Sequence, residues 1–217
     1  MSKQISLEEE IQANNTRIAQ ENRERFMRQY KLTHFGTRYQ ESDLCGLHVG
    51  SAEANKIVKW MDDPKDIFLY HGSPGIGKTH LCAALTEWAF RIFVSRRYHR
   101  EEDLLRRLRA GISAGHGDYL IQLEWLIDDQ FVILDDVGSG INPAKITHRD
   151  LEFRREVFFS FLDYRYRMRL PTVVTSNFSK ENFLEVYSER IASRLFSKQN
   201  TIISNFNTAD DKRQQGL

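Results

Sequence analysis

Short apolar runs alternate with longer segments of mixed polarity from residue 67 onward. The five runs are IFLYH (67–71), RIFVS (91–95), FVILD (131–135), TVVTS (172–176) and TIIS (201–204). These runs are rich in β-branched residues and are apolar at successive positions, which is typical of strands buried on both faces of a parallel sheet. The helical patterns between them cover residues 78–90, 101–110, 117–127, 149–168 and 180–195. This alternation predicts an α/β fold, with a parallel five-stranded sheet between helices.

The region before the first run has a different pattern. Residues 1–31 are polar with a thin apolar stripe at helical spacing, and Ser6 followed by Glu9 predicts a capping box. A turn-rich connector follows, and residues 52–62 predict a short helix. We expect a helical extension and connector over 1–48 and one main domain over 49–217. The extension is interpreted as a solvated helix, or alternatively as a handle for a partner protein.

Composition narrows the classes of protein that fit. The chain has 217 residues, of which 41% are hydrophobic, so one packed core is expected and wholesale disorder is not. Two distant cysteines exclude a disulfide scaffold and give no zinc-type spacing. The sequence has no signal peptide and no apolar run that would span a membrane, so we expect a cytoplasmic protein with no membrane partner. The net charge of +1 does not by itself indicate a nucleic-acid partner.

A phosphate-binding loop follows the first apolar run. Residues 72–79, GSPGIGKT, match the pattern G-x-x-x-x-G-K-[ST], and a helical pattern comes next. The loop's backbone N–H groups and the helix N-terminus would bind phosphate, Lys78 would contact the β- and γ-phosphates, and the Thr79 hydroxyl would ligate Mg²⁺. The predicted cofactors are therefore ATP and Mg²⁺. The predicted nucleotide-binding residues are Gly72, Ser73, Pro74, Gly75, Ile76, Gly77, Lys78, Thr79 and His80.

Two carboxylates end the third run. Asp135 is the candidate for the Mg²⁺ site, because the end of a neighbouring strand lies within reach of the phosphate loop. Asp136 is the candidate that polarises the attacking water. An Asp-Asp pair after an apolar run also fits a strand end followed by a turn, but the complete phosphate loop upstream favours the functional interpretation.

Three further segments make the pattern more specific. They are LDYRY (162–166), PTVVTSN (171–177) and ERIASRL (189–195). Together with GKTHL (77–81) and LDDVG (134–138), they closely resemble the DnaC/IstB branch of AAA+ ATPases over about residues 35–205. That branch contains replicative-helicase loaders and transposition helper ATPases. The resemblance implies an AAA+ P-loop NTPase core with a short N-terminal helical extension and a reduced C-terminal lid.

The resemblance also implies roles for two residues outside the loop. Asn177 corresponds to the sensor 1 residue, which would hold the attacking water or the γ-phosphate. Arg194 corresponds to an arginine finger that acts on ATP bound by a neighbouring subunit, with Arg190 assisting. The alternatives are a strand-end Asn that caps the next helix and solvated helix arginines. A finger supplied in trans implies self-association through ATP-bridged, head-to-tail interfaces.

Arginines are concentrated between residues 91 and 109. This segment has seven arginines against three acidic residues, an excess of +4 that the net charge conceals. Arg96, Arg97 and Arg100 are the candidates for DNA contacts, which would be electrostatic and depend strongly on salt. The alternative is a solvated surface whose arginines pair with acids.

The favoured function is an ATP-dependent DNA replication protein, a DnaC-like helicase loader that hydrolyses ATP. Its partners would be a replicative DNA helicase and single-stranded DNA in a bacterial or phage-infected cell. The first alternative is an IstB-like transposition helper that binds double-stranded DNA and recruits a transposase. The others are a P-loop kinase of small molecules and a module that binds ATP only as a conformational ligand.

Overall fold

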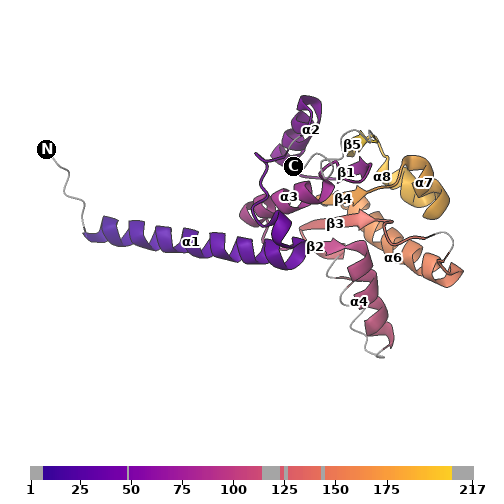
Figure 1. Cartoon of the computed structure of the whole chain (residues 1–217), viewed down its shortest axis with the longest axis horizontal. Coiled ribbons are helices and arrows are strands. Elements are labelled where there is room, and N and C mark those ends of the chain that lie inside the picture. The colour runs from indigo at the N-terminus through magenta and orange to yellow at the C-terminus, as the bar shows by residue number, and fades with distance from the viewer. Residues whose placement is uncertain (1–6, 48, 114–122, 125–126, 143–144, 207–217) are drawn as a thin grey trace. The chain divides into compact units, whose positions relative to one another are not determined.

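The computed structural model describes residues 7–47, 49–113, 123–124, 127–142 and 145–206. The chain forms two compact units, which divide between Ser42 and Asp43. This division falls inside the predicted connector. Figure 1 shows the elements of both units with their labels.

The first unit consists mainly of one long helix. Helix α1 (Leu7–Phe35) confirms the predicted N-terminal helix and extends it by four residues beyond residue 31. It ends at Gly36, whose φ of 83° lies in the left-handed region that favours glycine. A 3₁₀ turn, η1 (Thr37–Tyr39), follows, and the Lys31 ammonium donates to the Ser42 carbonyl at 2.5 Å. The predicted cap residue Ser6 lies outside the described residues.

The second unit is built on a parallel five-stranded sheet in the order β2-β3-β4-β1-β5. The strands are β1 (Ile67–Gly72), β2 (Arg96–Arg100), β3 (Phe131–Val137), β4 (Thr172–Ser176) and β5 (Thr201–Asn205). All four neighbouring pairs are parallel, so the carboxyl ends of the strands lie at one edge of the sheet. The sheet confirms the predicted fold class and four of the five predicted strands.

The predicted strand over 91–95 is wrong. Arg91 and Ile92 are the last residues of helix α3 (Lys78–Ile92), and the strand begins at Arg96. Strand β2 lies at an edge of the sheet, where charged side chains are tolerated. Only Tyr98, at its centre, is buried. An apolar run was therefore the wrong signal for this strand.

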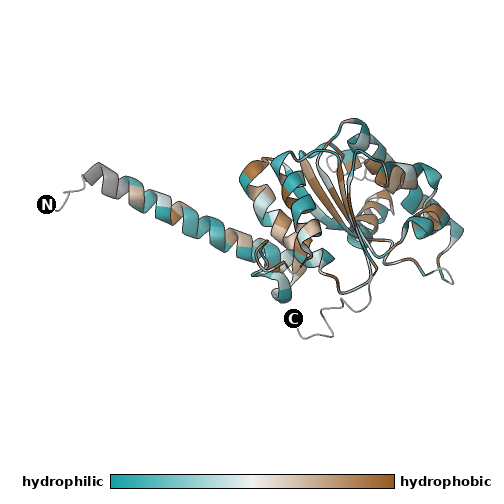
Figure 2. Ribbon diagram, turned by 90° about the horizontal axis from the view of Figure 1, so that it is seen from above, coloured by the Kyte–Doolittle hydropathy of each residue, from teal (hydrophilic) through white to brown (hydrophobic). Residues whose placement is uncertain are grey.

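Helices cover both faces of the sheet (Figures 1 and 2). Helices α2 (Ser51–Asp62) and α3 lie on one side. The other side carries α4 (Glu101–Ser113), α6 (His148–Arg167), α7 (Lys180–Val186) and α8 (Glu189–Leu195). No helix within the described part of the chain is long and apolar enough to cross a membrane.

The helix predicted over 180–195 is two helices. Ser188 separates them with a φ of 151°, and its hydroxyl accepts a hydrogen bond from the Ile191 N–H as the N-cap of α8. The break was not predicted, because the apolar helical pattern continues through this serine, although serine is a preferred N-cap residue. Most of the helix predicted over 117–127 lies outside the described residues.

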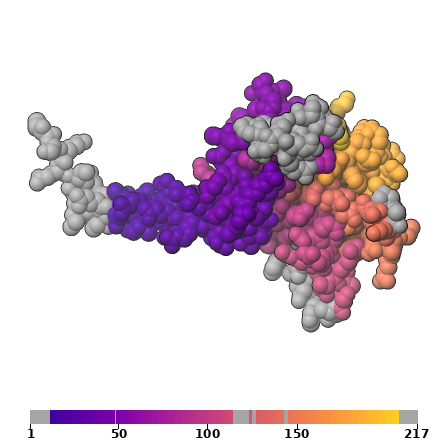
Figure 3. Space-filling view, viewed as in Figure 1, coloured from indigo at the N-terminus to yellow at the C-terminus, as the bar shows by residue number. Residues whose placement is uncertain are grey.

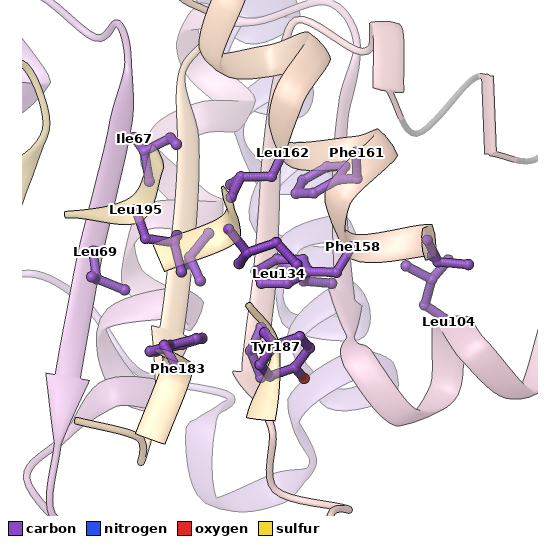
Figure 4. Packing of buried hydrophobic residues seen from close by; sticks show 14 of the residues in the cluster. Ile67, Leu69, Leu104, Leu134, Phe158, Phe161, Leu162, Phe183, Tyr187 and Leu195 are labelled. Carbon is purple, nitrogen blue, oxygen red and sulfur yellow. The ribbon is translucent and has the colours of Figure 1, made fainter. Parts of the chain in front are cut away.

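Alternate residues of the strands face the two helical layers. Figure 4 shows the larger core, in which Ile67 and Leu69 of β1 meet side chains from α4, α6, α7 and α8. On the opposite face the indole of Trp60, from α2, packs on the rings of Phe68 and Phe131, with centroids 5.3 and 6.2 Å away. The sheet is therefore buried on both faces, as the apolar runs predicted.

One arginine of helix α6 is completely buried. Arg165 donates to the Thr172 hydroxyl at 2.7 Å and to the carbonyls of Ile127, Asp129 and Pro171 at 2.7 to 3.0 Å. Burial lowers the pKa of Arg165 to about 9, so it is still a cation at neutral pH. These bonds fix the segments that precede β3 and β4 and thereby the start of both strands.

We expect Arg165→Met to destabilise the fold by about 3 kcal/mol, because it leaves buried carbonyl and hydroxyl groups without a donor. Urea unfolding measures this loss. The matched control is Arg149→Met, an exposed arginine of the same helix, for which we expect less than about 0.5 kcal/mol. A similar, small loss for both variants would contradict the structural role of Arg165.

Candidate active site

The phosphate loop joins the end of β1 to the start of α3. Gly72, Gly75 and Gly77 have φ values of 152°, 88° and 99°, which other residues rarely adopt. At Gly72 there is also no room, because a Cβ atom would lie 1.7 Å from the Asn205 carbonyl oxygen of β5. The close approach of β5 therefore requires glycine at the first position of the motif.

Side chains within the loop hold its conformation. The Lys78 ammonium donates to the carbonyls of Gly72 and Ser73, both at 2.8 Å, and so lies within the loop. Ile76 is buried, and its carbonyl accepts a hydrogen bond from the Tyr70 hydroxyl at 3.1 Å. These hydrogen bonds tie Lys78 and Ile76 to the residues where the loop leaves β1.

The other predicted nucleotide-binding residues belong to this loop or to the first turn of α3. Pro74 is exposed at the tip of the loop. His80, on the first turn of α3, contacts the Asp43 carbonyl through Nε2 at 3.1 Å, which places it against the connector. The remaining residue, Thr79, faces the neighbouring strand end.

Asp135 is buried at the carboxyl end of β3. Its Oδ2 lies 3.4 Å from the Thr79 hydroxyl and accepts from the Tyr98 hydroxyl at 3.0 Å. The Thr175 hydroxyl donates to Oδ1. Burial raises the pKa of Asp135, and the hydrogen bonds from Thr175 and Tyr98 oppose that shift. Burial also raises the pKa of Tyr98, so its hydroxyl is protonated and donates.

Asp136 occupies a β-bulge. The β3–β4 register is irregular between Leu134 and Val137, and Asp136 has a φ of 62°. The bulge returns Val137 to the core face and turns Asp136 toward the sheet edge. There its carboxylate accepts from Arg100 at 3.0 Å and lies 3.4 Å from the Asn177 amide nitrogen.

The structure brings four predicted site residues together beside the loop: Thr79, Asp135, Asp136 and Asn177. Arg194 is not among them. It lies on α8 and pairs with Asp163 of α6, and no described contact joins it to this group.

The three arginines predicted to contact DNA are spread along β2. Arg96 and Arg97 pair in register with the first residues of β3, whereas Arg100 pairs with Asp135 at the carboxyl edge. Arg96 lies over the Phe90 ring at 3.6 Å, and Arg97 forms an ion pair with Asp129. The strand therefore places Arg96 and Arg97 near the amino ends of the strands and Arg100 near the carboxyl ends. The contact of all three arginines with DNA stays a prediction.

Several residues of the site were not predicted from the sequence. Thr175 donates to Asp135 and its hydroxyl accepts from the Asp136 N–H at 2.9 Å, so one side chain holds both acids. Thr175 lies within the segment PTVVTSN, but only the final Asn was assigned. Tyr98 was not assigned, and Arg100 was predicted as a DNA contact and not as the partner of Asp136.

His71, the residue before the loop, is also part of this edge. Its Nδ1 contacts the Phe178 carbonyl at 2.9 Å, and its Nε2 faces the Ser204 hydroxyl. A carbonyl only accepts, so Nδ1 carries the proton and Nε2 accepts from the serine in the neutral ring. Burial lowers the pKa of His71, with a smaller opposing effect of the hydrogen bond to Phe178.

The donor set suits a hard cation. Thr79 and Asp135 offer oxygen atoms, which Mg²⁺ prefers, and Mg²⁺ commonly takes only one or two protein ligands beside phosphates and water. No group of three or more His, Cys, Asp and Glu side chains with metal-site geometry occurs among the residues that the structure describes.

A phosphate loop after β1, an acidic end on β3 and a polar end on β4 in a sheet of this order define a P-loop ATPase of the AAA+ class. The chain matches the family of IstB-like ATP-binding proteins over residues 3–197 and belongs to it. It is therefore an AAA+ ATPase. Among curated proteins, none matches the sequence.

Solved structures share this fold at low sequence identity. The DnaC helicase loader is 22% identical with a TM-score of 0.61, over 77% of this chain and 98% of that one. DnaI is also 22% identical with a TM-score of 0.61, over 79% and 95%. The replication initiator DnaA bound to AMPPCP and single-stranded DNA is 18% identical, with a TM-score of 0.62 over 76% and 49%. The chain spans about half the length of the replication-initiator structures that it matches.

The lowered pKa of His71 predicts a pH-dependent stability. The unfolded chain takes up a proton near the usual pKa of 6.5, whereas the folded chain does so only at lower pH, so stability is full above 6.5 and falls as the pH drops below it. We expect the urea midpoint to fall between pH 7.5 and 5.5, and to fall less in His71→Gln. His148→Gln, which replaces an exposed histidine, is the control and should keep the wild-type loss. An equal loss in His71→Gln would assign the pH dependence to other groups.

Proposed function

We propose that this protein is an ATP-dependent loader of a replicative DNA helicase. The observation that supports this proposal most is that the acids of β3 and the amide of Asn177, after β4, meet beside the phosphate loop. The chain also covers nearly all of a DnaC helicase loader structure. ATP binding and hydrolysis would switch the protein between assembly states. The long helix α1 is the proposed contact for the helicase.

The site residues have distinct proposed roles. Lys78 and the N–H groups of the loop bind the phosphates, and Thr79 and Asp135 hold Mg²⁺. When bound, Mg²⁺ and ATP supply a phosphoryl group that is activated for transfer to water. Asp136 accepts a hydrogen bond from that water, and the Asn177 amide orients it from the adjacent strand.

Arg194 is proposed to complete the site of a neighbouring subunit. It lies outside the group formed by Thr79, Asp135, Asp136 and Asn177, and it is 23% exposed on α8. Its described contacts are with Asp163 and Arg190 and not with the phosphate loop of its own chain, so we propose that it acts on ATP bound by the next subunit. Self-association through head-to-tail, ATP-bridged contacts then becomes part of the mechanism.

Single-stranded DNA is the proposed nucleic-acid partner. A DnaA structure with the same fold was determined with AMPPCP and single-stranded DNA. Arg96, Arg97 and Arg100 of β2 remain the candidate contacts in this chain. Because all three already have partners within the chain, phosphate would have to compete with Asp129 for Arg97 and with Asp136 for Arg100.

A transposition helper is the second candidate, favoured by the match to IstB-like ATP-binding proteins. It would bind double-stranded DNA and recruit a transposase. A P-loop kinase is a weaker candidate, because a small-molecule kinase has no use for an arginine supplied by another subunit.

Co-purification with the replicative helicase of the host, with and without ATP, tests the proposed function. We expect wild-type protein to retain the helicase in an ATP-dependent manner. Lys78→Ala should bind ATP about 10- to 100-fold more weakly, the worth of a charge-assisted hydrogen bond, and should lose that dependence. Lys59→Ala, an exposed lysine of α2, should behave as wild type.

Two results would contradict this proposal. Failure to retain the helicase, together with tight binding of double-stranded DNA and a transposase, would assign the protein to the helper class. Normal ATP binding by Lys78→Ala would instead overturn the role of the phosphate loop.

Arg194→Ala tests supply of the arginine in trans. We expect ATP binding close to that of wild type and a kcat lower by about 10³-fold, the lower end of the range for an arginine finger. Mixing Arg194→Ala with Lys78→Ala should restore turnover, because each variant supplies what the other lacks. The exposed Lys198→Ala is the control for a lost positive charge near α8. If no mixing ratio restores turnover, the arginine does not act in trans.

A further inference from the structure

Helices α6 and α8 meet through buried leucines whose chain neighbours carry opposite charges. Leu162 and Leu195 are fully buried in the same core cluster. The next residue of α6, Asp163, and the preceding residue of α8, Arg194, have side chains that are 21% and 23% exposed. Figure 3 shows the segment of α7 and α8 (yellow-orange) at the surface beside α6 (orange). Core packing thus determines where both charged groups lie.

The Asp163 carboxylate holds two nitrogens of the Arg194 guanidinium. Its Oδ1 accepts from Nε at 2.7 Å and lies 2.5 Å from Nη2. The Nη1 group donates to the Arg190 carbonyl at 2.7 Å. Because a guanidinium has five N–H donors, these described contacts leave one N–H on each terminal nitrogen. A planar guanidinium uses that pair to bind two oxygens of one phosphate group.

An aromatic ring supports the same guanidinium from α6. Phe159 lies one helical turn before Asp163, and the Arg194 guanidinium carbon is 4.8 Å from its ring centroid. Arg190 lies over the same ring at 4.2 Å. Arg194 is therefore confined by a ring and a carboxylate that α6 presents on one face.

The backbone of Arg194 is fixed as well. The Asn200 side-chain amide donates to the carbonyls of Arg194 and Leu195, at 2.6 and 2.9 Å. The amide oxygen of the same Asn accepts from the Ile67 N–H at 3.3 Å. The last turn of α8 is therefore tied to the first residue of β1, the strand that leads to the phosphate loop.

Asp163 is itself held in place. Its Oδ2 accepts from Arg167 at 3.0 Å, so both carboxylate oxygens have a guanidinium partner. Burial works in the opposite direction, but the hydrogen bonds and charges of Arg194 and Arg167 lower the pKa of Asp163. The carboxylate is therefore ionised throughout the neutral range.

We propose that Asp163 is a positioning residue for Arg194. Its carboxylate holds Nε and Nη2 of the guanidinium. The two remaining terminal N–H groups then point as a pair toward the phosphate of ATP in the neighbouring subunit. The proposal rests on the proposed function, in which Arg194 acts in trans. Asp163 touches no nucleotide, and it acts only through the arginine.

Asp163→Asn tests this role with little change in size. We expect ATP affinity and KM to stay near the wild-type values, because the variant's own phosphate loop is intact. We expect kcat to fall by about tenfold or more, since a misplacement of about 1 Å can cost 10²-fold. Asp163→Glu, which restores the carboxylate, should recover part of kcat. Glu156→Gln is the matched control: it removes an exposed carboxylate of the same helix and should leave kcat near wild type.

Two further measurements separate positioning from a general structural role. The double variant Asp163→Asn/Arg194→Ala should have the kcat of Arg194→Ala alone, because the carboxylate has nothing left to position. Mixing Asp163→Asn with Lys78→Ala should restore turnover, because the second variant supplies an intact Asp163–Arg194 pair in trans. If Asp163→Asn lowered kcat only by weakening the fold, it would lower the unfolding midpoint, and its loss of kcat would add to that of Arg194→Ala. Mixing it with Lys78→Ala would then not restore turnover.

The outcomes distinguish this inference from the proposed function. If Arg194→Ala loses turnover while Asp163→Asn keeps the wild-type kcat, the positioning role is overturned and the action of Arg194 stands. Additive losses in the double variant overturn the positioning role in the same way. If Arg194→Ala turns over ATP normally, the action in trans fails and the role of Asp163 fails with it.

Discussion

The hydroxyl of Thr175 connects the Asp135 carboxylate to the backbone of Asp136, and the site depends on both residues. It donates to Asp135 and accepts from the backbone N–H of Asp136 at 2.9 Å. Without that bond the bulge in β3 would leave a half-buried N–H group unpaired, which costs up to about 1–3 kcal/mol. The bulge is what turns Asp136 out of the core and lets Val137 pack in its place. One polar contact between adjacent strands thus allows two successive acids to face different parts of the site.

The parallel arrangement of the strands brings the acids held by Thr175 to the same edge as the rest of the site. Because all four strand pairs are parallel, the phosphate loop, the acids of β3 and Asn177 reach the same edge of the sheet without further adjustment. The core between the sheet and helices α4, α6, α7 and α8 has a second role. It sets the contact between α6 and α8 through Leu162 and Leu195, and so places the charged residues beside them. Residues that never touch nucleotide therefore determine both the cis and the trans parts of the proposed site.

The sequence predicted the features that depend on local pattern. The apolar runs located β1, β3, β4 and β5, and the phosphate-loop motif located the turn whose first glycine faces the Asn205 carbonyl. It did not predict β2, because an edge strand has less need of apolar side chains. It also missed Thr175, His71 and Arg165, whose roles come from partners far away in the sequence. Such residues resemble ordinary polar residues until the fold brings their partners to them.

Charge counted along the chain was informative only in part, for the same reason. The segment 91–109 has an excess of positive charge, but its arginines find acids in other elements: Arg97 pairs with Asp129, Arg100 with Asp136 and Arg109 with Asp150. These acids precede β3, end β3 and begin α6. The local excess is therefore largely balanced in space. A phosphate that binds to Arg97, Arg100 or Arg109 must replace a carboxylate, so the gain from the new contact is reduced by the loss of the old one. Arg97 and Arg100 of β2 thus stabilise the fold through ion pairs, and these pairs would have to break before either arginine binds a partner.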